Sequence, residues 1–471
     1  MFFFRFMAAA GCGAVLASAV GAGTAGGQTF VNWAQYLYSA GHTSDNLAAT
    51  TITPANAATV TAASKLTPPD SPTTGQGGFF ASPTVYNGVI YIGSRNGYFY
   101  AVSESTGKII WSRFIGVVTH KTCGAEGFTS TATVAPDPTS GEPTVYVYGA
   151  TGYLYAMNAA DGTDVWPPAV VAIPSTTTND YYAWSSPLVS GGTIYVGISS
   201  QCDNPLVRAG LDAFSQTTGA LENTFWTTPA GTRGASIWSS PATDGSAIYI
   251  TTGNGPKTSD GQSLIQLDPA LSRELGSWTV PASERSGDSD FGGSPGIWTA
   301  TIRGVPTELV GACNKNGVFY ALNATSVSAG PVWQLRIGNS FATGPGQCDA
   351  APDFDGSALY LSGNGTTIKG TAYNGSVRAV NPATGAVLWQ TGLTGFIIGT
   401  PGLDGSGVIA AASYGSTTGK NGVWLINAST GKILKTISYG KAGTFGQPVF
   451  ADGYLIVAST AGHSLQAYRA G

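Results

Sequence analysis

Four short segments of this chain, rich in Gly and Ser, contain side chains that could react or bind a ligand: a carboxylate, an amide, an ammonium group and an indole. The segments hold Trp238 in IWSSP, Asn254 in TTGNG, Asp290 in DSDFGG and Lys315 in ACNKNG. A carboxylate held near a cation and a bound hydroxyl can act as a general base, and an amide oxygen suits a hard cation such as Ca²⁺. These residues could therefore bind a metal ion and accept a proton, provided that the fold brings them together.

Each of these residues also has a purely structural interpretation. Asp288 and Asp290 could cap a turn, and Asn254 beside a glycine could be a turn residue that tolerates a positive φ. Lys315 could be the solvated tip of a hairpin, and Trp238 could pack in a core. Their joint presence favours the functional interpretation of all of them.

A repeat of tryptophans shows which elements must position these residues. Six recur with gaps of 55, 60, 52, 55 and 56 residues: Trp111, Trp166, Trp226, Trp278, Trp333 and Trp389. Most close one phrase, which reads AVSESTGKIIW at 101–111, AMNAADGTDVW at 156–166 and AVNPATGAVLW at 379–389, with a weaker copy at 425–435. Such a period is typical of stacked or radial repeats. We interpret the tryptophans and the Thr-Gly turns as scaffold that packs between neighbouring units.

Each unit reads as four short strands. A Ser-Pro or similar step is followed by an alternating run such as 84–94, a turn, a run such as 97–103, a Thr-Gly turn and the run that ends in Trp. No segment has helical apolar periodicity of useful length. The pattern predicts an all-β fold, an eight-bladed β-propeller of four-stranded antiparallel blades. The units begin near Ser82, Thr129, Ser185, Ser239, Ser294, Ala350, Thr400 and Gln447.

The last unit ends at Gly471 after three strands. We expect Ala57–Leu66 to supply its missing outer strand, which would close the ring of a single domain over 28–471 and leave no large open edge. The starts of first strands and the turns after second strands should then share one face near the axis. The residues expected at that end of the channel, where propellers bind ligands, are Trp184, Trp238, Asp290, Cys348, Asp203, Asn254, Lys315, Cys202 and Cys313.

Composition narrows the class of protein. Charged residues are only 10% of the 471 and the formal charge is −4, so no basic patch exists for nucleic acid. Residues 1–27 resemble a secretory signal, with Arg5 before a small-residue apolar run. A lipid-anchor signal at Cys12 is the alternative. No later stretch is long and apolar enough to span a bilayer.

Four cysteines remain if this signal is cleaved: Cys123, Cys202, Cys313 and Cys348. An even number in an exported protein favours disulfides, with three possible connectivities. No C-x-x-C or C-x-x-C-H occurs, which excludes a haem attachment site and a zinc ribbon in this chain. The histidines are scattered, and we expect none of them near a motif: His42, His120 and His463.

The phrase A-x-[ND]-x-x-T-G-x-x-x-W resembles the repeat of the eight-bladed quinoprotein (PQQ-type) propellers, and the resemblance covers roughly residues 31–471. Longer phrases look most like the polyvinyl-alcohol dehydrogenase branch of that superfamily. They are TCGAEGFTST at 122–131, AWSSPLVSGGTIYVGISSQCDNPLVRAG at 183–210, IWSSPATDGSAIYITTGNG at 237–255, DSDFGGSP at 288–295 and ACNKNGVFYALN at 312–323.

The resemblance implies a role for each candidate residue. Asp290 would ligate Ca²⁺ and take the proton of the alcohol, and Asn254 would be a second metal ligand. Trp238 would stack under the quinone ring of PQQ, and Lys315 would polarise the quinone carbonyls. Asp203 lies near the position of a glutamate ligand, but the motif here has changed to Gln-Cys-Asp-Asn-Pro.

The chain also departs from many relatives in this superfamily. It lacks the adjacent Cys-Cys pair, which the polymer-alcohol branch also lacks. It has no haem domain, so electrons would pass to a separate cytochrome c-like or quinone acceptor. The proximity of their blades leads us to pair Cys123 with Cys202 and Cys313 with Cys348, chiefly as staples for long loops.

Together these features predict a secreted, periplasmic or cell-surface alcohol dehydrogenase that depends on PQQ and Ca²⁺ and oxidises a secondary or polymeric alcohol. The alternative is a non-catalytic extracellular propeller that acts as a binding or assembly scaffold. A lyase or hydrolase on the same fold is a further option, since fold does not dictate function.

Overall fold

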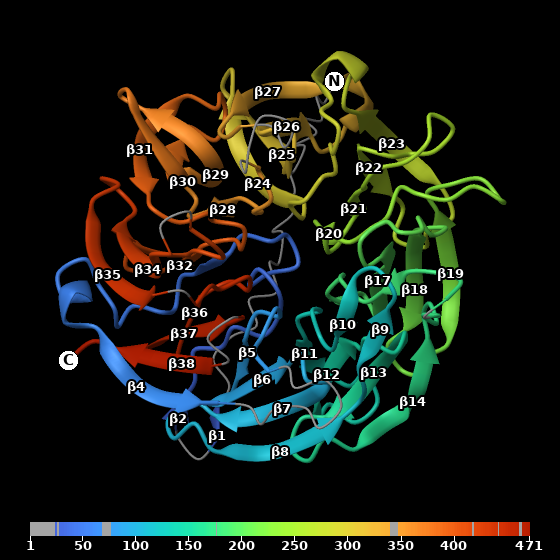
Figure 1. Ribbon diagram of the computed structural model, residues 1–471, viewed down its shortest axis with the longest axis horizontal. Helices are drawn as coiled ribbons and strands as arrows, with labels where there is room; N and C mark the ends of the chain where they lie inside the picture. The colour runs from blue at the N-terminus through green and yellow to red at the C-terminus, as the bar shows by residue number, and fades with distance from the viewer. Residues whose placement is uncertain are drawn as a thin grey trace, which may run out of the picture.

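Eight four-stranded antiparallel sheets are arranged radially around one axis, and the chain passes through them in sequence order (Figure 1). The structure is a computed structural model that describes residues 24–25, 28–67, 77–175, 177–339, 347–416, 419–440, 442–460 and 464–471. Most of the expected signal sequence and His463 lie outside these residues. The predicted eight-bladed propeller is confirmed.

Each blade runs from a short inner strand to an exposed outer strand. Blade 1 consists of β5 Thr84–Tyr86, β6 Val89–Gly93, β7 Tyr98–Ser103 and β8 Ile109–Phe114, and blade 2 consists of β11 Thr133–Pro136, β12 Pro143–Tyr148, β13 Tyr153–Asn158 and β14 Asp164–Val170. Blade 3 consists of β16 Leu188–Ser190, β17 Thr193–Ser200, β18 Gly210–Ser215 and β19 Leu221–Trp226, and blade 4 consists of β20 Ala242–Thr243, β21 Ile248–Thr251, β22 Ser263–Leu267 and β23 Glu274–Thr279. Blade 5 consists of β24 Gly296–Ile302, β25 Val305–Asn314, β26 Val318–Asn323 and β27 Pro331–Arg336, and blade 6 consists of β28 Asp353–Phe354, β29 Leu359–Ile368, β30 Thr371–Val380 and β31 Val387–Leu393. Blade 7 consists of β32 Gly402–Asp404, β33 Val408–Ala412, β34 Asn421–Asn427 and β35 Ile433–Gly440, and blade 8 consists of β36 Val449–Ala451, β37 Tyr454–Ser459, β38 Ser464–Arg469 and β4 Thr61–Leu66.

The remaining elements are short. They are β1 Thr24–Ala25, β2 Gln28–Thr29, β3 Asp45–Asn46, β9 Val118–His120, β10 Gly124–Glu126, β15 Tyr181–Tyr182 and the 3-10 turns η1 Ala57–Thr59, η2 Ala282–Glu284 and η3 Val327–Ala329. No helix among the described residues is long and apolar enough to cross a membrane.

The repeated tryptophan and the Thr-Gly turn form one packing unit across each blade boundary. Trp333 donates its indole N–H to the carbonyl oxygen of Pro382 in the next blade at 3.1 Å. The Thr-Gly glycine of that blade, Gly385, has φ +69° and lies flat on the indole, where an added Cβ would approach Trp333 to 2.5 Å. The same indole donation is made by Trp111, Trp166 and Trp389. Glycine is therefore required there by both backbone conformation and contact.

Two of the six evenly spaced tryptophans do not occupy this position, which corrects the sequence interpretation. Trp226 is 39% exposed at the end of β19, with the Arg208 guanidinium 3.8 Å from its ring centroid. Asn223 occupies the repeat position instead and donates to the carbonyl oxygens of Ala270 and Leu271. Trp278 stands two residues beyond Gly276, which takes the repeat position in blade 4.

The recurring Ser-Pro step builds a ring of hydroxyl groups around the axis. The backbone N–H of Ser186 donates to the hydroxyl of Ser240 at 3.0 Å, and the N–H of Ser240 donates to the hydroxyl of Ser294 at 2.9 Å. Equivalent bonds join Gln447 to Ser82, Ser82 to Thr131, Thr131 to Ser186 and Ala351 to Thr400. Blades 6 and 8 have no hydroxyl to contribute, because Ala351 and Gln447 stand at this position. We call these residues the hydroxyl ring.

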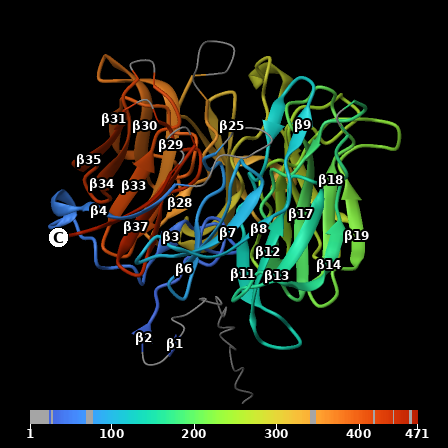
Figure 2. The ribbon, with the colours of Figure 1, turned by 60° about the horizontal axis from the view of Figure 1, so that its bottom comes forward.

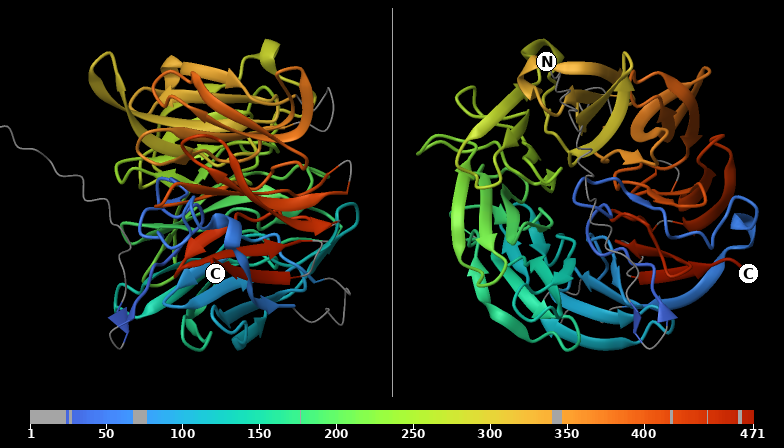
Figure 3. Two further views of the ribbon diagram at one scale, coloured as in Figure 1. Left: turned by 90° about the vertical axis from the view of Figure 1, so that its left-hand side faces the viewer. Right: turned by 180° about the vertical axis from the view of Figure 1, so that it is seen from behind.

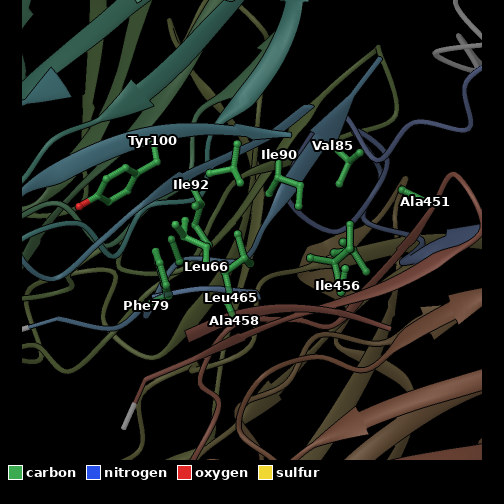
Figure 4. Packing of buried hydrophobic residues seen from close by; sticks show 14 of the residues in the cluster. Leu66, Phe79, Val85, Ile90, Ile92, Tyr100, Ala451, Ile456, Ala458 and Leu465 are labelled. Carbon is green, nitrogen blue, oxygen red and sulfur yellow. The ribbon is translucent and has the colours of Figure 1, made fainter. Parts of the chain in front are cut away.

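The first and last blades meet in a seam built from both ends of the chain. Strand β4 pairs antiparallel with β38, from Thr61 opposite Arg469 to Leu66 opposite Leu465. Residues 57–59 of the segment expected as a strand form the turn η1 instead. Figure 4 shows the apolar side chains that fill the seam, among them Leu66, Ile92 and Ile456.

A segment before β4 closes one end of the channel. Residues 31–46, which we call the N-terminal strap, hydrogen-bond through their backbone to seven blades, in six of them to the inner strand and in blade 8 to the turn after it. The strap and blade partners are Val31 with Asp452, Trp33 with Val85, Ala34 with Val134, Ala40 with Thr243, Gly41 with Ile297, Thr43 with Phe354 and Ser44 with Leu403. Seen from behind, the blue strap reaches the centre of the ring (Figure 3). Figure 2 shows β9 on the face opposite β1 and β2.

Candidate active site

Each unit has one residue three positions before the proline of its Ser-Pro step, or before the residue that replaces this proline. These residues line the channel near the end opposite the strap. We call these eight residues the upper ring: Phe80, Thr129, Trp184, Trp238, Gly292, Asp349, Ile398 and Phe445. In six blades the strap contacts the first strand two residues after the proline or its equivalent. Five residues therefore separate the two levels, or about 16 Å at the usual rise per strand residue. Tyr36 of the strap lines the same cavity.

Lys315 is the centre of a charged cluster beside the upper ring. Its Nζ lies 3.0 Å from Asp288 Oδ2 and 3.2 Å from Asp290 Oδ2, and its side chain is 16% exposed. Burial by itself would lower the pKa of Lys315, but the carboxylates of Asp290, Asp349 and Asp288 outweigh burial and raise it above its ordinary value. The lysine therefore stays charged and is fixed by its acidic neighbours.

Asp290 is held in place by the loops that follow β21 and β25. Its Oδ1 accepts the backbone N–H of Asn254 at 2.5 Å, and its backbone oxygen accepts the N–H of Lys315 at 2.9 Å. Burial raises the pKa of Asp290 to about 6, against the opposing effect of Lys315. A carboxyl group with this pKa can hold or release a proton near neutral pH.

Asn254 connects the two carboxylates of the DSD segment. Its amide nitrogen donates to Asp288 Oδ1 at 2.8 Å, and its amide oxygen accepts from Gln262 Nε2 at 2.9 Å. The oxygen faces Ser289 as well, whose N–H lies 3.4 Å away. Asn254 is thus in the second-strand turn that the sequence indicated, next to Asp290.

Trp238 presents a ring face to Lys315, whose Nζ lies 5.0 Å from the ring centroid. The edge of Trp238 meets Trp184 at 6.3 Å between centroids. The indole N–H of Trp238 is buried and has no hydrogen-bond partner among the described residues. An aromatic face flanked by a cation and a free donor suits a planar ligand that carries oxygen acceptors.

Asp203 lies at the same mouth but is less tightly connected. It accepts a hydrogen bond from the Ser200 hydroxyl. Burial raises its pKa, while Lys315 acts in the opposite direction and Asp288 adds to the increase. No hydrogen bond within the described ranges joins Asp203 to Asp290 or Asn254. The structure therefore brings Trp238, Asn254, Asp290 and Lys315 into contact through one network and places Asp203 beside it.

The sequence interpretation missed Asp349, a member of the upper ring. Its side chain is 8% exposed, and both carboxylate oxygens lack a hydrogen-bond partner in the part of the chain that the structure describes. Burial raises the pKa of Asp349 to about 6, and Lys315 opposes the increase. Its position three residues before Pro352 could have identified it, because Trp238 occupies that position in its own unit.

His120 was expected to be far from every motif, and this expectation is wrong. Its Nδ1 hydrogen-bonds to the amide oxygen of Gln201, two residues before Asp203, and lies 3.5 Å from Asp180 Oδ1. The strands β9 and β10, which form a hairpin between blades 1 and 2, bring His120 there. His42 lies in the strap at the other end, with its Nδ1 2.8 Å from the backbone oxygen of Pro295.

Both predicted disulfides are present, Cys123–Cys202 and Cys313–Cys348. Three half-cystines lie within two residues of a charged group at the mouth: Cys202 precedes Asp203, Cys348 precedes Asp349 and Cys313 precedes Lys315 by two. The second disulfide is fully buried, whereas Cys202 is exposed. The disulfides thus anchor the loops that carry the charges.

Aromatic side chains form the wall of the mouth across blades 7, 8, 1 and 3. Phe80 meets Phe445 at 5.1 Å and Trp184 at 6.3 Å between centroids. Tyr414 packs on Phe445 at 5.5 Å. The mouth therefore has an apolar side and a charged side.

The residues present fit a hard cation and a planar cofactor. Four carboxylates, Asp203, Asp288, Asp290 and Asp349, face the single charge of Lys315, and a cation would offset this excess. Carboxylate and amide oxygens are the ligands that Ca²⁺ prefers. Trp238 and Lys315 supply the stacking surface and the positive group that a quinone with carbonyl oxygens requires.

Comparison with solved structures shows the same fold at low sequence identity. The quinohemoprotein alcohol dehydrogenase from Comamonas testosteroni aligns with a TM-score of 0.70 and 17% identity over 93% of this chain and 80% of that one. A europium-containing methanol dehydrogenase aligns with a TM-score of 0.72 and 13% identity over 93% and 98%. BamB from Moraxella catarrhalis aligns with a TM-score of 0.55 and 15% identity over 87% and 99%.

No curated protein matches this chain. The family described as outer membrane protein assembly factor BamB, PQQ_2, matches residues 48–345 and 373–471, which is most of the chain. The eight blades, the Trp and Thr-Gly packing units and this match agree, and the chain belongs to the PQQ_2 family of propellers.

Proposed function

We propose that this protein is an exported alcohol dehydrogenase that depends on PQQ and Ca²⁺ and oxidises a secondary or polymeric alcohol. The observation that carries the proposal is the network of Trp238, Asn254, Asp290 and Lys315 at the open end of the channel. A scaffold has no need of a buried carboxyl and lysine pair beside a half-buried indole at that place. The dehydrogenases with the same fold support this reading.

Asp290 is the general base in this proposal. Its Oδ1 is occupied by the N–H of Asn254, and its Oδ2 faces Lys315. A pKa of about 6 leaves the carboxyl group mostly ionised at neutral pH and able to accept the proton of an alcohol. Lys315 keeps this carboxylate oriented toward the mouth.

Trp238 and Lys315 would hold the cofactor. PQQ, when bound, would supply the two-electron acceptor that takes the hydride equivalent of the alcohol. The indole face would support the ring system, and the unpartnered indole N–H would donate to an oxygen. Lys315 would place its charge next to the quinone carbonyls.

Asp290, Asn254 and Asp203 would hold the metal ion. The amide oxygen of Asn254 accepts two hydrogen bonds in the structure, from Gln262 and Ser289, and would exchange one of them for the cation. Because the mouth holds more carboxylates than lysines, the binding of a divalent cation there is favoured.

The mouth fits a neutral, partly apolar alcohol. The wall of Phe80, Phe445 and Trp184 offers contact area for a hydrocarbon backbone, while the hydroxyl group would reach the charged side. Two disulfides support an oxidising compartment, in line with the signal expected at residues 1–27. Electrons would leave to a separate acceptor, a cytochrome c-like protein or a quinone.

Titration of the purified protein with PQQ, with and without Ca²⁺, tests the proposal. Quinone absorbance and thermal stability report binding, and tight binding that needs Ca²⁺ is expected. An artificial electron acceptor then allows a screen of alcohols. Failure to bind PQQ at any Ca²⁺ concentration contradicts the proposal.

Replacement of the base gives an independent test. Asp290→Asn keeps the size of the side chain and an oxygen acceptor for the N–H of Asn254, but it cannot take a proton. We expect dye-linked alcohol oxidation to be abolished, with circular dichroism unchanged. Asp161→Asn, in the exposed turn after β13, is the matched control and should keep full turnover. Unchanged turnover in Asp290→Asn would rule out the assignment.

A binding or assembly scaffold is the second candidate, favoured by the description of the matching family and by the likeness to BamB. The upper ring is then a ligand site without catalysis. This function would be supported if the protein bound no PQQ but bound a partner saturably, and if Phe445→Ala weakened that binding.

A further inference from the structure

We propose that Asp180 is a positioning residue that holds Asp203 in place as a metal ligand, braced by the β9–β10 hairpin. The inference rests on the metal site proposed above and extends it beyond the residues that face the ion. It assigns a role to a buried carboxylate that no sequence motif indicates. It also gives the Cys123–Cys202 disulfide a role in the site.

The loop that carries Asp203 has a backbone conformation that needs support from its surroundings. Asp203 has φ +59°, in the left-handed region, where a non-glycine residue is uncommon. The loop follows β17, and none of the described strands pairs with it at Asp203. Such a conformation persists when the surroundings determine it.

Asp180 supplies those surroundings. It is fully buried, and its Oδ2 accepts the backbone N–H groups of Cys202 at 2.9 Å and Asn204 at 3.2 Å. These are the two residues on either side of Asp203. The backbone oxygen of Asp180 accepts the N–H of Gln201 at 2.7 Å. One residue therefore fixes the backbone on both sides of Asp203.

The β9–β10 hairpin braces Asp180 and the loop from the other side. His120 Nδ1 contacts both Gln201 and Asp180, and Cys123 Sγ lies 3.5 Å from Asp180 Oδ1. The Cys123–Cys202 disulfide joins the hairpin to the loop covalently. A bidentate pair, Arg95 with Glu126 at 2.8 and 2.6 Å, ties the far strand of the hairpin to blade 1.

This arrangement matches the outer shell of a metal site. Partners that hydrogen-bond to ligand-bearing groups fix their orientation, and their loss commonly costs about 10–100-fold in metal affinity. Asp180 does not line the channel, so it would act through Asp203 alone. A carboxylate that merely stabilised the loop would change unfolding without changing the binding of an ion through Asp203.

Calorimetric titration of the full-length protein with CaCl₂ alone tests the inference. We expect Asp180→Ala to weaken Ca²⁺ binding about 10–100-fold, and the milder Asp180→Asn, which keeps an oxygen acceptor, to weaken it less. Asp203→Asn should weaken binding too. The double variant with Asp180→Ala should bind no more weakly than the weaker of the two single variants, because both changes remove the same ligand.

Asp137→Ala is the matched control. Asp137 also accepts backbone N–H groups in a turn, from Thr139 at 3.0 Å and Ser140 at 2.7 Å, but this turn follows β11 at the end away from the mouth. Its loss should leave Ca²⁺ affinity within about twofold of wild type, as for distant independent sites.

The outcomes separate the two proposals. If the wild type binds no Ca²⁺, the proposed metal site fails and this inference falls with it. If the wild type binds and Asp203→Asn weakens binding but Asp180→Ala does not, or if the two effects add in the double variant, only the role of Asp180 is overturned. Ca²⁺ binding that is unaffected by Asp203→Asn overturns it as well.

A second variant keeps the test valid if Asp180→Ala fails to fold. Cys123→Ser with Cys202→Ser leaves Asp180 intact and frees the loop from the hairpin, so Ca²⁺ affinity should again fall. A dithiol should give the same result in the wild type: it breaks the S–S bond, leaves one thiol on each cysteine and becomes a cyclic disulfide. The buried Cys313–Cys348 should remain closed. Unchanged affinity after opening of Cys123–Cys202 contradicts the proposed bracing.

Discussion

A pair of carboxyl groups in the seam between the first and last blades should make the stability of the ring depend on pH. Glu104 follows β7, is 3% exposed and faces Asp452, which follows β36. Glu104 Oε1 and Asp452 Oδ2 are both buried without a donor among the described residues. The neutral form of one carboxyl group, which can donate its proton to the other, is therefore favoured. Burial, and then Asp452, raise the pKa of Glu104 to about 9.

The sign and size of the effect follow from this shift. A group whose pKa is raised on folding binds its proton more tightly in the folded state, so its contribution is complete below the unfolded pKa and is lost as pH rises toward the folded pKa. Each pH unit between about 4.5 and 9 therefore removes up to about 1.4 kcal/mol. Between pH 5 and pH 8 this contribution falls by up to about 4 kcal/mol.

Glu104→Gln should remove this dependence. The amide can donate to Asp452 at every pH, so the variant should gain stability over the wild type as pH rises from 5 to 8. Urea unfolding at each pH measures the difference, and Glu142→Gln, an exposed acid in the β11–β12 turn, is the control. A difference between Glu104→Gln and wild type that stays constant over this pH range refutes the raised pKa of Glu104.

Two further predictions concern the scaffold. Ile456→Ala, in the seam of Figure 4, should cost about 2–5 kcal/mol because it leaves a cavity among fully buried side chains, whereas Ile433→Ala at an exposed site should cost far less; urea unfolding compares them. Gly385→Ala should lower the melting temperature more than Gly356→Ala. Both glycines have a positive φ, but only the Cβ at Gly385 would meet another residue, Trp333. Equal losses for the two glycine variants would show that backbone conformation alone matters.

The blades could be predicted from the sequence because their signals are local and repeat in register. The Ser-Pro step marks the hydroxyl ring, and the Thr-Gly turn marks the surface on which the preceding tryptophan packs. The even spacing of the tryptophans was misleading in blade 3. Trp226 stands three residues past the repeat position, and Asn223 makes the hydrogen bond to the next blade in its place.

The candidate site was predictable to the extent that it follows the repeat. Trp238 and Asp290 lie in the segments that lead into first strands, and Lys315 and Asn254 lie in turns after second strands. Blade geometry therefore places all four at one end of the channel. The exact network of hydrogen bonds among them depends on side-chain contacts across blades, and no spacing encodes it.

The parts that could not be predicted lie outside the repeat. His120 and Asp180 belong to insertions between blades, the β9–β10 hairpin and the residue before β15, and the described parts of the other units contain no counterpart to these insertions. The strap was missed for a different reason. It binds the blades through backbone groups, which leave no pattern of side chains in the sequence.

The strap also determines how a large molecule can meet this protein. Because residues 31–46 cover one end of the channel, a long chain cannot thread through the ring as it would through a pore. If the substrate is a polymer, as proposed above, it must instead fold a short segment or an end into the mouth and withdraw it by the same route. Successive reactions on one polymer would then require release and rebinding, so modified groups should be scattered along the chain rather than run in an unbroken series.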